Sequence, residues 1–285
     1  MRYGYDSGCS KPSGGGLAGD AAFDVAGALG VTLEEIEGPA GCAASELAMN
    51  AIAAFARVGR LLALAGRQLS QRQDATVPPA VVTPCSACFL NLSHTIRSLT
   101  THTDLRERVA EELAATGLSL SPGSVRVRHL LDVLWEDAGP DAIRRRVTRP
   151  LAGLRVAPYY GCLTTSRDCP DLDREEPVHH SRLEEILSAL GAEVVGFPLK
   201  DHCCGGRAAN ASEEVATSLQ HRILRSATDH GAQVIATVCP RCLNNLDSGQ
   251  EPVNRRFRTA FALPVRTFTD LMAEAFEVKA LGVRS

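Results

Sequence analysis

The chain has 285 residues, of which 45% are apolar and 22% are charged, and its formal net charge at pH 7 is −3. This length suits two ordinary domains or one large domain, and the composition is typical of a soluble globular protein. The slight excess of acidic residues argues against a general electrostatic affinity for nucleic acid.

The sequence favours a reducing, cytoplasmic setting. Residues 1–6 are polar and aromatic, so we expect no signal peptide. The most apolar helical stretch, residues 47–69, carries Arg57, Arg60 and Arg67, which predicts a buried or amphipathic helix and no membrane span. Because cytoplasmic thiols stay reduced, the ten cysteines favour a metal or redox site over structural disulfides.

The predicted elements follow the same order in each half of the chain. A strand ends at a cysteine, and an amphipathic helix follows that stops at a glycine. A second strand then leads to another cysteine site, and a longer helix comes next. Finally, an apolar strand ends at a CxxC motif, which begins a further helix. In the first half these features are residues 3–8, Cys9, residues 23–31 with Gly30, Cys42, residues 45–69, residues 81–84, and Cys85 with Cys88. In the second half they are residues 154–157, Cys162, residues 183–192 with Gly191, Cys203 with Cys204, residues 211–230, residues 234–238, and Cys239 with Cys242.

This repetition indicates a gene duplication. Cys9 precedes Cys162 by 153 positions, and Cys85 precedes Cys239 by 154. Strands that alternate with helices indicate parallel sheets, whose ligand sites lie at the carboxyl ends of the strands. We therefore predict an α/β fold of two pseudo-symmetric halves, residues 1–149 and 150–285. Each half is expected to hold a small, mainly parallel sheet flanked by helices, with its cysteines just after the strands.

The helix predicted over residues 211–230 has its own periodic signal. Val215, Leu219 and Ile223 recur within it at helical spacing.

The second half holds more thiols than one zinc ion uses. A CxxC motif at the start of a helix brings two anionic sulfurs to one centre, and three further cysteines precede it. Adjacent cysteines fit poorly on one tetrahedral ion but can reach different irons of a polynuclear cluster. Gly205-Gly206 would let the backbone approach that cluster closely. The predicted ligands of this five-cysteine site are Cys162, Cys203, Cys204, Cys239 and Cys242.

The pattern Cys162…Cys203-Cys204-Gly205…Cys239-Pro240-Arg241-Cys242 resembles the cysteine-rich CCG domain of the B subunit of heterodisulfide reductase. The resemblance extends over nearly the whole chain. It implies a noncubane [4Fe-4S] cluster on the five cysteines and chemistry that makes or cleaves a sulfur–sulfur bond. It also implies two partners: a C-subunit-like protein with cubane [4Fe-4S] clusters and a flavin-containing A-subunit-like protein.

The first half departs from the family pattern. Where the family has a cysteine pair, this chain has Gly41-Cys42-Ala43, and Cys42 aligns with either member of that pair. Four thiols suit a cubane [4Fe-4S] cluster or, alternatively, a zinc ion. The predicted ligands of this four-cysteine site are Cys9, Cys42, Cys85 and Cys88.

This departure is similar to that of the sulfur-oxidising, heterodisulfide-reductase-like branch, whose substrate is a thiol, disulfide or persulfide, either a small molecule or protein-bound. On this interpretation Cys203 and Cys204 stand at the reactive cluster, with His202 and Lys200 as nearby groups that tune it. Cys169 has no counterpart in the first half and is interpreted as an ordinary thiol. Two alternatives stay open: a CCG protein that links a succinate-, glycolate- or lactate-type flavin dehydrogenase to quinone, and a non-catalytic zinc scaffold.

Overall fold

The structure is a computed structural model that describes residues 1–8, 21–38, 51–70, 79–121, 123–165, 181–206 and 212–278. Within these residues the chain forms two four-stranded sheets in which every pairing is parallel. The first sheet has the order β2-β1-β3-β4 and the second the order β6-β5-β7-β8, so the topology repeats. The predicted α/β fold with two parallel sheets is therefore confirmed. The strands are β1 Arg2–Tyr5, β2 Thr32–Glu35, β3 Ala80–Thr83, β4 Arg126–His129, β5 Arg155–Tyr159, β6 Glu193–Val194, β7 Val234–Thr237 and β8 Val265–Thr267.

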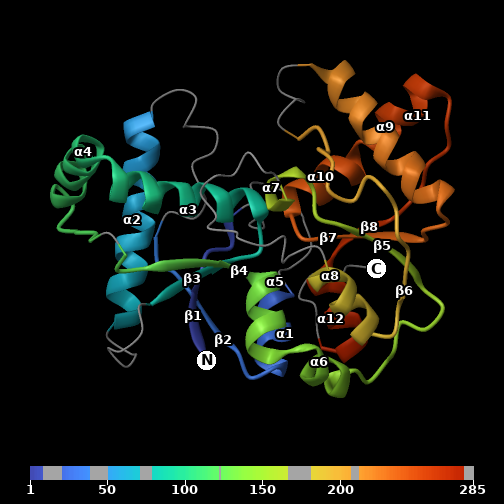
Figure 1. The fold of residues 1–285 in the computed structure, drawn as a ribbon, viewed down its shortest axis with the longest axis horizontal. Coiled ribbons are helices and arrows are strands. Elements are labelled where there is room, and N and C mark those ends of the chain that lie inside the picture. The colour runs from blue at the N-terminus through green and yellow to red at the C-terminus, as the bar shows by residue number, and fades with distance from the viewer. Residues whose placement is uncertain are drawn as a thin grey trace.

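Helices flank both sheets (Figure 1). In the first half they are α1 Ala22–Ala28, α2 Ala51–Ser70, α3 Ser86–Thr101, α4 Thr103–Ala114, α5 Leu130–Val133, a π-helical turn at Leu134–Ala138, and α6 Pro140–Arg146. In the second half they are α7 Cys162–Thr165, α8 Arg182–Ala189, α9 Glu213–Asp229, α10 Pro240–Ser248, α11 Gln250–Phe257 and α12 Phe268–Phe276. Within the described residues, no helix is both long and apolar enough to cross a bilayer.

The central strands and helix ends form where the sequence predicts them. All residues of β3 and β7 are buried, which explains why both read as continuous apolar runs. Helices α1 and α8 end just before Gly30 and Gly191, which take φ values of +74° and +84°. Cys85 and Cys239 are the N-cap residues of α3 and α10, so each CxxC does open a helix.

Three features differ from the sequence-based expectation. The edge strands β4 and β8 were not predicted. Helix α9 is present and Ile223 is buried, but Val215 is 48% exposed and Leu219 is only partly buried, because the buried face runs through Ala216 and Gln220 to Ile223. The first part of the helix predicted over residues 45–69 lies outside the described residues, and α2 is described from Ala51.

The two halves share one hydrophobic core. A single cluster of buried side chains takes residues from α1 and α5 of the first half and from α8 and α12 of the second. The helix contacts are reciprocal, since α12 packs on α1 and α5 packs on α8 (Figure 1). Each half therefore covers apolar surface that the other half cannot cover alone.

A buried ion-pair network crosses this interface. The Arg182 guanidinium lies 2.7 Å from carboxylate oxygens of both Asp132 and Glu136. It also stacks over the Trp135 ring at 4.7 Å, and the Trp135 indole N–H donates to Glu185 at 2.7 Å. Only 7% of the Arg182 side chain is exposed, so its charge is strongly coupled to these partners.

We expect Arg182→Met to lower the free energy of unfolding by about 3–5 kcal/mol, because it removes the buried guanidinium that pairs with the Asp132 and Glu136 carboxylates. Thermal unfolding followed by circular dichroism measures the loss. Asp132→Leu in the same chain should recover part of it. The control is Arg225→Met, which removes an exposed pair with Asp229 and should cost less than about 1 kcal/mol. Equal losses in the two single variants would contradict the assigned role of Arg182.

Candidate metal centre

Three separate segments carry the five-cysteine site. Cys162 begins α7, directly beyond the end of β5. Cys239 caps α10 beyond β7, and Cys242 lies in the first turn of that helix. The Cys203-Cys204 pair lies in a loop that leaves β6 and runs through residues 195–202 first. The expectation that every cysteine directly follows a strand is therefore wrong for this pair, because a loop carries it to the sheet edge.

The structure brings these five thiols together in one connected group. The Sγ atoms of Cys204 and Cys242 lie 3.4 Å apart and share a hydrogen bond. Cys162 lies close enough to Cys203, and Cys239 close enough to Cys242, for each pair of thiols to shift one another's pKa. Cys204, Cys239 and Cys242 are buried, whereas Cys162 and Cys203 are partly exposed. Solvent therefore does not reach the sulfurs on the α10 side of the group, but it reaches those of Cys162 and Cys203 in part.

Backbone contacts fasten the loop of the cysteine pair to the end of β5. The backbone N–H groups of Tyr160 and Gly161 both donate to the Lys200 carbonyl, at 2.8 and 3.1 Å. The buried Tyr159 hydroxyl donates to the His202 carbonyl at 2.5 Å. Segments 159–162 and 200–204 are therefore held side by side, which keeps Cys162 next to Cys203. Tyr159 was not predicted as a site residue, and its place directly before the Tyr-Gly-Cys segment was the only available signal.

Gly205 is needed for close packing behind the pair. It has a φ of +81°, and a Cβ there would lie 3.0 Å from the Ala216 Cα on α9. Its backbone N–H donates to the Cys203 sulfur at 3.3 Å. A Cβ on Gly206 would lie 3.4 Å from the Cys204 sulfur. The glycines thus let the loop lie against α9 while its N–H groups face the sulfurs.

The thiols perturb one another strongly. The hydrogen bond with Cys242 lowers the pKa of Cys204 to about 7, against the opposing effect of burial and with help from Gly206 and Asn245. Hydrogen bonds with Cys242 and then Cys85 lower the pKa of Cys239, while those with Cys204 and Cys239 raise the pKa of Cys242. Burial and then the neighbouring Cys203 raise the pKa of Cys162 to about 12. Burial and then the adjacent cysteines raise the pKa of Tyr159, so its hydroxyl stays a donor.

The donor set fits a polynuclear thiolate-bound cluster better than a single ion. Within the described residues, no group of three or more His, Cys, Asp or Glu side chains has the arrangement of a metal-ion site, so the case for a cluster rests on the number and type of the donors. An iron–sulfur cluster distributes its ligands over several irons, and five neighbouring cysteine thiolates, which are soft donors, suit that chemistry.

The four-cysteine site is described in part. Cys85 and Cys88 are fully buried, while Cys9 and Cys42 lie outside the described residues. Gly8 passes directly over Cys88, because a Cβ there would lie 2.6 Å from the Cys88 sulfur. The end of β1 therefore directs the chain toward the first CxxC motif, as the sequence pattern predicts.

The two CxxC motifs meet across the halves. The sulfurs of Cys85 and Cys239 are 3.8 Å apart, and both side chains are buried in the same apolar cluster. Helix α3, which Cys85 opens, also contacts α7, which Cys162 opens. No sequence motif indicates this contact, since it depends on how the two sheets are oriented.

His202 and Lys200 lie beside the pair, and each has a carboxylate partner. The Lys200 ammonium pairs with Glu184 at 2.7 Å, and the half-exposed His202 ring bonds to Asp201 at 3.1 Å. Their proposed roles toward a cluster stay predictions. Cys169 lies outside the described residues.

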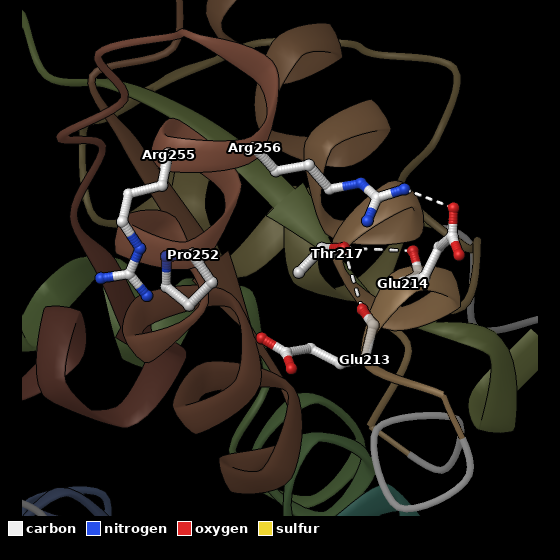
Figure 2. A pocket seen from close by; sticks show the side chains of 6 residues that line it. All are labelled: Glu213, Glu214, Thr217, Pro252, Arg255 and Arg256. Carbon is white, nitrogen blue, oxygen red and sulfur yellow. Dashed lines mark hydrogen bonds and ion pairs between the residues drawn. The ribbon is translucent and has the colours of Figure 1, made fainter.

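A surface groove between α9 and α11 has a charged lining and is not part of the five-cysteine site. Figure 2 shows its charged lining, in which Arg256 pairs with Glu214 and Thr217 bonds to the backbone of α9. No cysteine or histidine lines it among the described residues. Because Arg255 and Arg256 pair with exposed carboxylates, we interpret the groove as ordinary solvated surface.

We expect Gly205→Ala to destabilise the chain by about 1–3 kcal/mol, because alanine is strained at positive φ and its methyl group would press on α9. The matched control is Gly196→Ala in the same loop, where an added Cβ meets nothing within 4 Å. That variant should stay within about 0.5 kcal/mol of the parent. Thermal unfolding measures both, and a Gly196→Ala loss as large as that of Gly205→Ala would refute the packing argument.

Comparison with known proteins agrees with this geometry. The family described as CCG, cysteine-rich domain, matches residues 156–247, which contain all five cysteines of the second half. The 8-methylmenaquinol:fumarate reductase membrane anchor subunit of Wolinella succinogenes is 31% identical over 257 residues, which are 90% of this chain and 85% of that protein. The B subunit of the ferredoxin:CoB-CoM heterodisulfide reductase of Methanosarcina mazei is 30% identical over 231 residues, which are 78% and 74% of the two chains.

A solved structure shares the fold. A hypothetical protein from Helicobacter pylori superposes with a TM-score of 0.67 at 10% sequence identity. The superposition covers 98% of this chain, which spans only 49% of that one. With the topology, the five converging thiols and the relatives at 30% identity or more all in agreement, this chain belongs to the family of CCG cysteine-rich domain proteins that includes the B subunit of heterodisulfide reductase.

Proposed function

We propose that this chain is the catalytic iron–sulfur subunit of a heterodisulfide-reductase-like complex, an oxidoreductase that makes or cleaves a sulfur–sulfur bond. The observation that carries the proposal is the meeting of five thiols from three segments at one sheet edge. Kinship with the B subunit of heterodisulfide reductase supports it.

The proposed ligands of a noncubane [4Fe-4S] cluster are Cys162, Cys203, Cys204, Cys239 and Cys242. When bound, such a cluster supplies electrons to, or takes them from, a sulfur substrate. Cys9, Cys42, Cys85 and Cys88 would hold a second cluster, a cubane [4Fe-4S] or alternatively zinc. Buried Cys204, Cys239 and Cys242 would keep water from one side of the site.

The exposure pattern suits a substrate that approaches from outside. Cys162 and Cys203 are the partly exposed members of the group, so a thiol, disulfide or persulfide sulfur would reach the cluster past them. Such a sulfur could belong to a small molecule or to a carrier protein, as in the sulfur-oxidising branch of the family. The 3.8 Å contact between Cys85 and Cys239 supports electron exchange between the two sites. Electrons would come and go through the iron–sulfur partner and the flavin-containing partner, in the reducing cytoplasm.

A second candidate function has its own support. The relative from Wolinella succinogenes is named a subunit of an 8-methylmenaquinol:fumarate reductase. This chain would then be the CCG electron-transfer protein that links a flavin dehydrogenase of the succinate, glycolate or lactate type to a quinone. The same cysteines would serve, but no sulfur substrate would bind.

Metal analysis tests the cluster directly. After anaerobic purification we expect iron and acid-labile sulfide in near-equal amounts, with four irons for each filled site. Cys204→Ser should lose the iron of the second half because it removes a buried ligand, and Cys169→Ser should keep it. Zinc in place of iron and sulfide would overturn both redox proposals in favour of a zinc scaffold.

Substrate-dependent spectroscopy separates the two redox functions. We expect a thiol or disulfide added to the oxidised protein to change the EPR signal of the second-half cluster, because a substrate sulfur would bind next to it. Rapid oxidation of the reduced cluster by a menaquinone analogue, with no response to thiols or disulfides, would favour the quinone-linked function instead.

A further inference from the structure

The first turn of α8 reaches the loop of the cysteine pair through one carboxylate. Glu184 lies in this turn, and both of its carboxylate oxygens are used: one accepts a hydrogen bond from the Tyr160 hydroxyl, and the other pairs with the Lys200 ammonium at 2.7 Å. Tyr160 stands two positions before Cys162. Lys200 stands three positions before Cys203. One carboxylate therefore joins the two segments that carry the partly exposed cysteines of the site.

Glu184, Tyr160 and Lys200 form a closed triangle of contacts, which we call the Glu184 clamp. The Tyr160 backbone N–H donates to the Lys200 carbonyl at 2.8 Å, and the Lys200 ammonium lies 5.8 Å from the centre of the Tyr160 ring. The Tyr160 hydroxyl also accepts the Leu183 backbone N–H at 3.0 Å. Tyr160 is fully buried, and the Glu184 and Lys200 side chains are only 21% and 30% exposed, so solvent screens their ion pair less than at an open surface.

The loop needs such contacts because the sheet supports it only at its start. Strand β6 is two residues long, and its pairing with β5 ends where Val156 faces Val194, whereas β5 continues to Tyr159. Residues 195–202, which lead to the cysteine pair, belong to no strand or helix of the described structure. The placement of the pair relative to Cys162 therefore depends on the contacts that hold this loop.

Helix α8 is itself fixed to the first half. Arg182, two positions before Glu184, pairs with Asp132 at 2.7 Å. Glu185, one position after it, accepts the Trp135 indole N–H at 2.7 Å. The first turn of α8 therefore holds the first half through Arg182 and Glu185, and it holds the loop through Glu184. Because the helix is anchored in this way, the Glu184 carboxylate offers the loop a rigid support.

We propose that Glu184 is a positioning residue of the five-cysteine site. Its carboxylate clamps Tyr160 to Lys200 and thereby holds the Cys162 segment against the loop of the cysteine pair. The inference rests on the cluster proposed above. Residues behind metal ligands orient those ligands, and their loss typically weakens metal binding about 10- to 100-fold. Without the clamp the loop would move more freely beside β5, so the site would release iron faster.

The first half lacks this clamp. In the repeat, Ser7 takes the place of Tyr160, because each stands two positions before the first cysteine of its half. Ser7 is buried, and its hydroxyl has no hydrogen-bond partner among the described residues. The clamp therefore occurs in the half that keeps the complete cysteine pair, as we expect if it serves that pair.

The test compares two neighbouring carboxylates of α8 in the full chain, purified anaerobically. Glu184→Gln keeps the shape but loses the charge that holds the Lys200 ammonium. The matched control, Glu185→Gln, makes the same change one position later, where the carboxylate faces the first half. Hydrogen–deuterium exchange reports on the Tyr160 and Gly161 amides, which donate to the Lys200 carbonyl. We expect these amides to exchange about tenfold faster in Glu184→Gln and at the parent rate in the control.

The second readout is the rate at which a chelator removes iron. The iron that is missing from Cys204→Ser belongs to the second half, and we expect Glu184→Gln to release this fraction about tenfold faster than the parent. Glu185→Gln should release it at the parent rate. Lys200→Met removes the partly exposed end of the clamp and should produce both changes. The double variant of Glu184→Gln with Lys200→Met should change no more than the larger single variant, because both act through one contact.

Each outcome decides the proposal. Unchanged exchange, or unchanged iron release, in both Glu184→Gln and Lys200→Met would overturn it, as would equal changes in Glu185→Gln. If Glu184→Gln no longer melts cooperatively, Lys200→Met decides by the same two measurements. A parent protein without iron would refute the proposed function, whereas the exchange comparison would still decide whether Glu184 holds the two cysteine segments together.

Discussion

The contact between the sulfurs of Cys85 and Cys239 joins equivalent points of the duplicated chain. Each residue ends a central buried strand and caps the helix that follows. A residue that touches its own counterpart lies on a twofold axis, so the pseudo-symmetry of the molecule passes between these two thiols. This geometry places both CxxC motifs beside one axis and packs them into the same apolar cluster. The same axis relates the contact of α1 with α12 to the contact of α8 with α5.

The five-cysteine site combines rigid and adjustable parts. Cys162, Cys239 and Cys242 stand at the ends of buried strands and on helix starts, where the core fixes their positions. The Cys203-Cys204 pair depends on hydrogen bonds from Tyr159 and Asn245 and on the absence of a side chain at Gly205. The sheet and the helix ends therefore position three of the five cysteines, and local contacts of the loop position the other two.

Local patterns allowed much of this fold to be predicted. Buried strands β3 and β7 read as apolar runs, and the glycines at 30 and 191 ended their helices. Edge strands β4 and β8 were not predicted because exposed edges tolerate charged residues such as those of Arg126–His129. The cysteine motifs identified the family and the candidate ligands. The contact of Tyr159 with the loop of the cysteine pair and the meeting of the two CxxC motifs could not be inferred, because they depend on long-range packing that no local pattern encodes.

The reciprocal helix packing bears on the origin of the chain. Because each half lends helices to cover the other, a half-length ancestor would have exposed a wide apolar face as a monomer. It would have been stable as an isologous homodimer, with paired cysteine sites beside its symmetry axis. Fusion into one polypeptide then freed the two copies to diverge, and the unequal cysteine counts of the two present-day halves record that divergence.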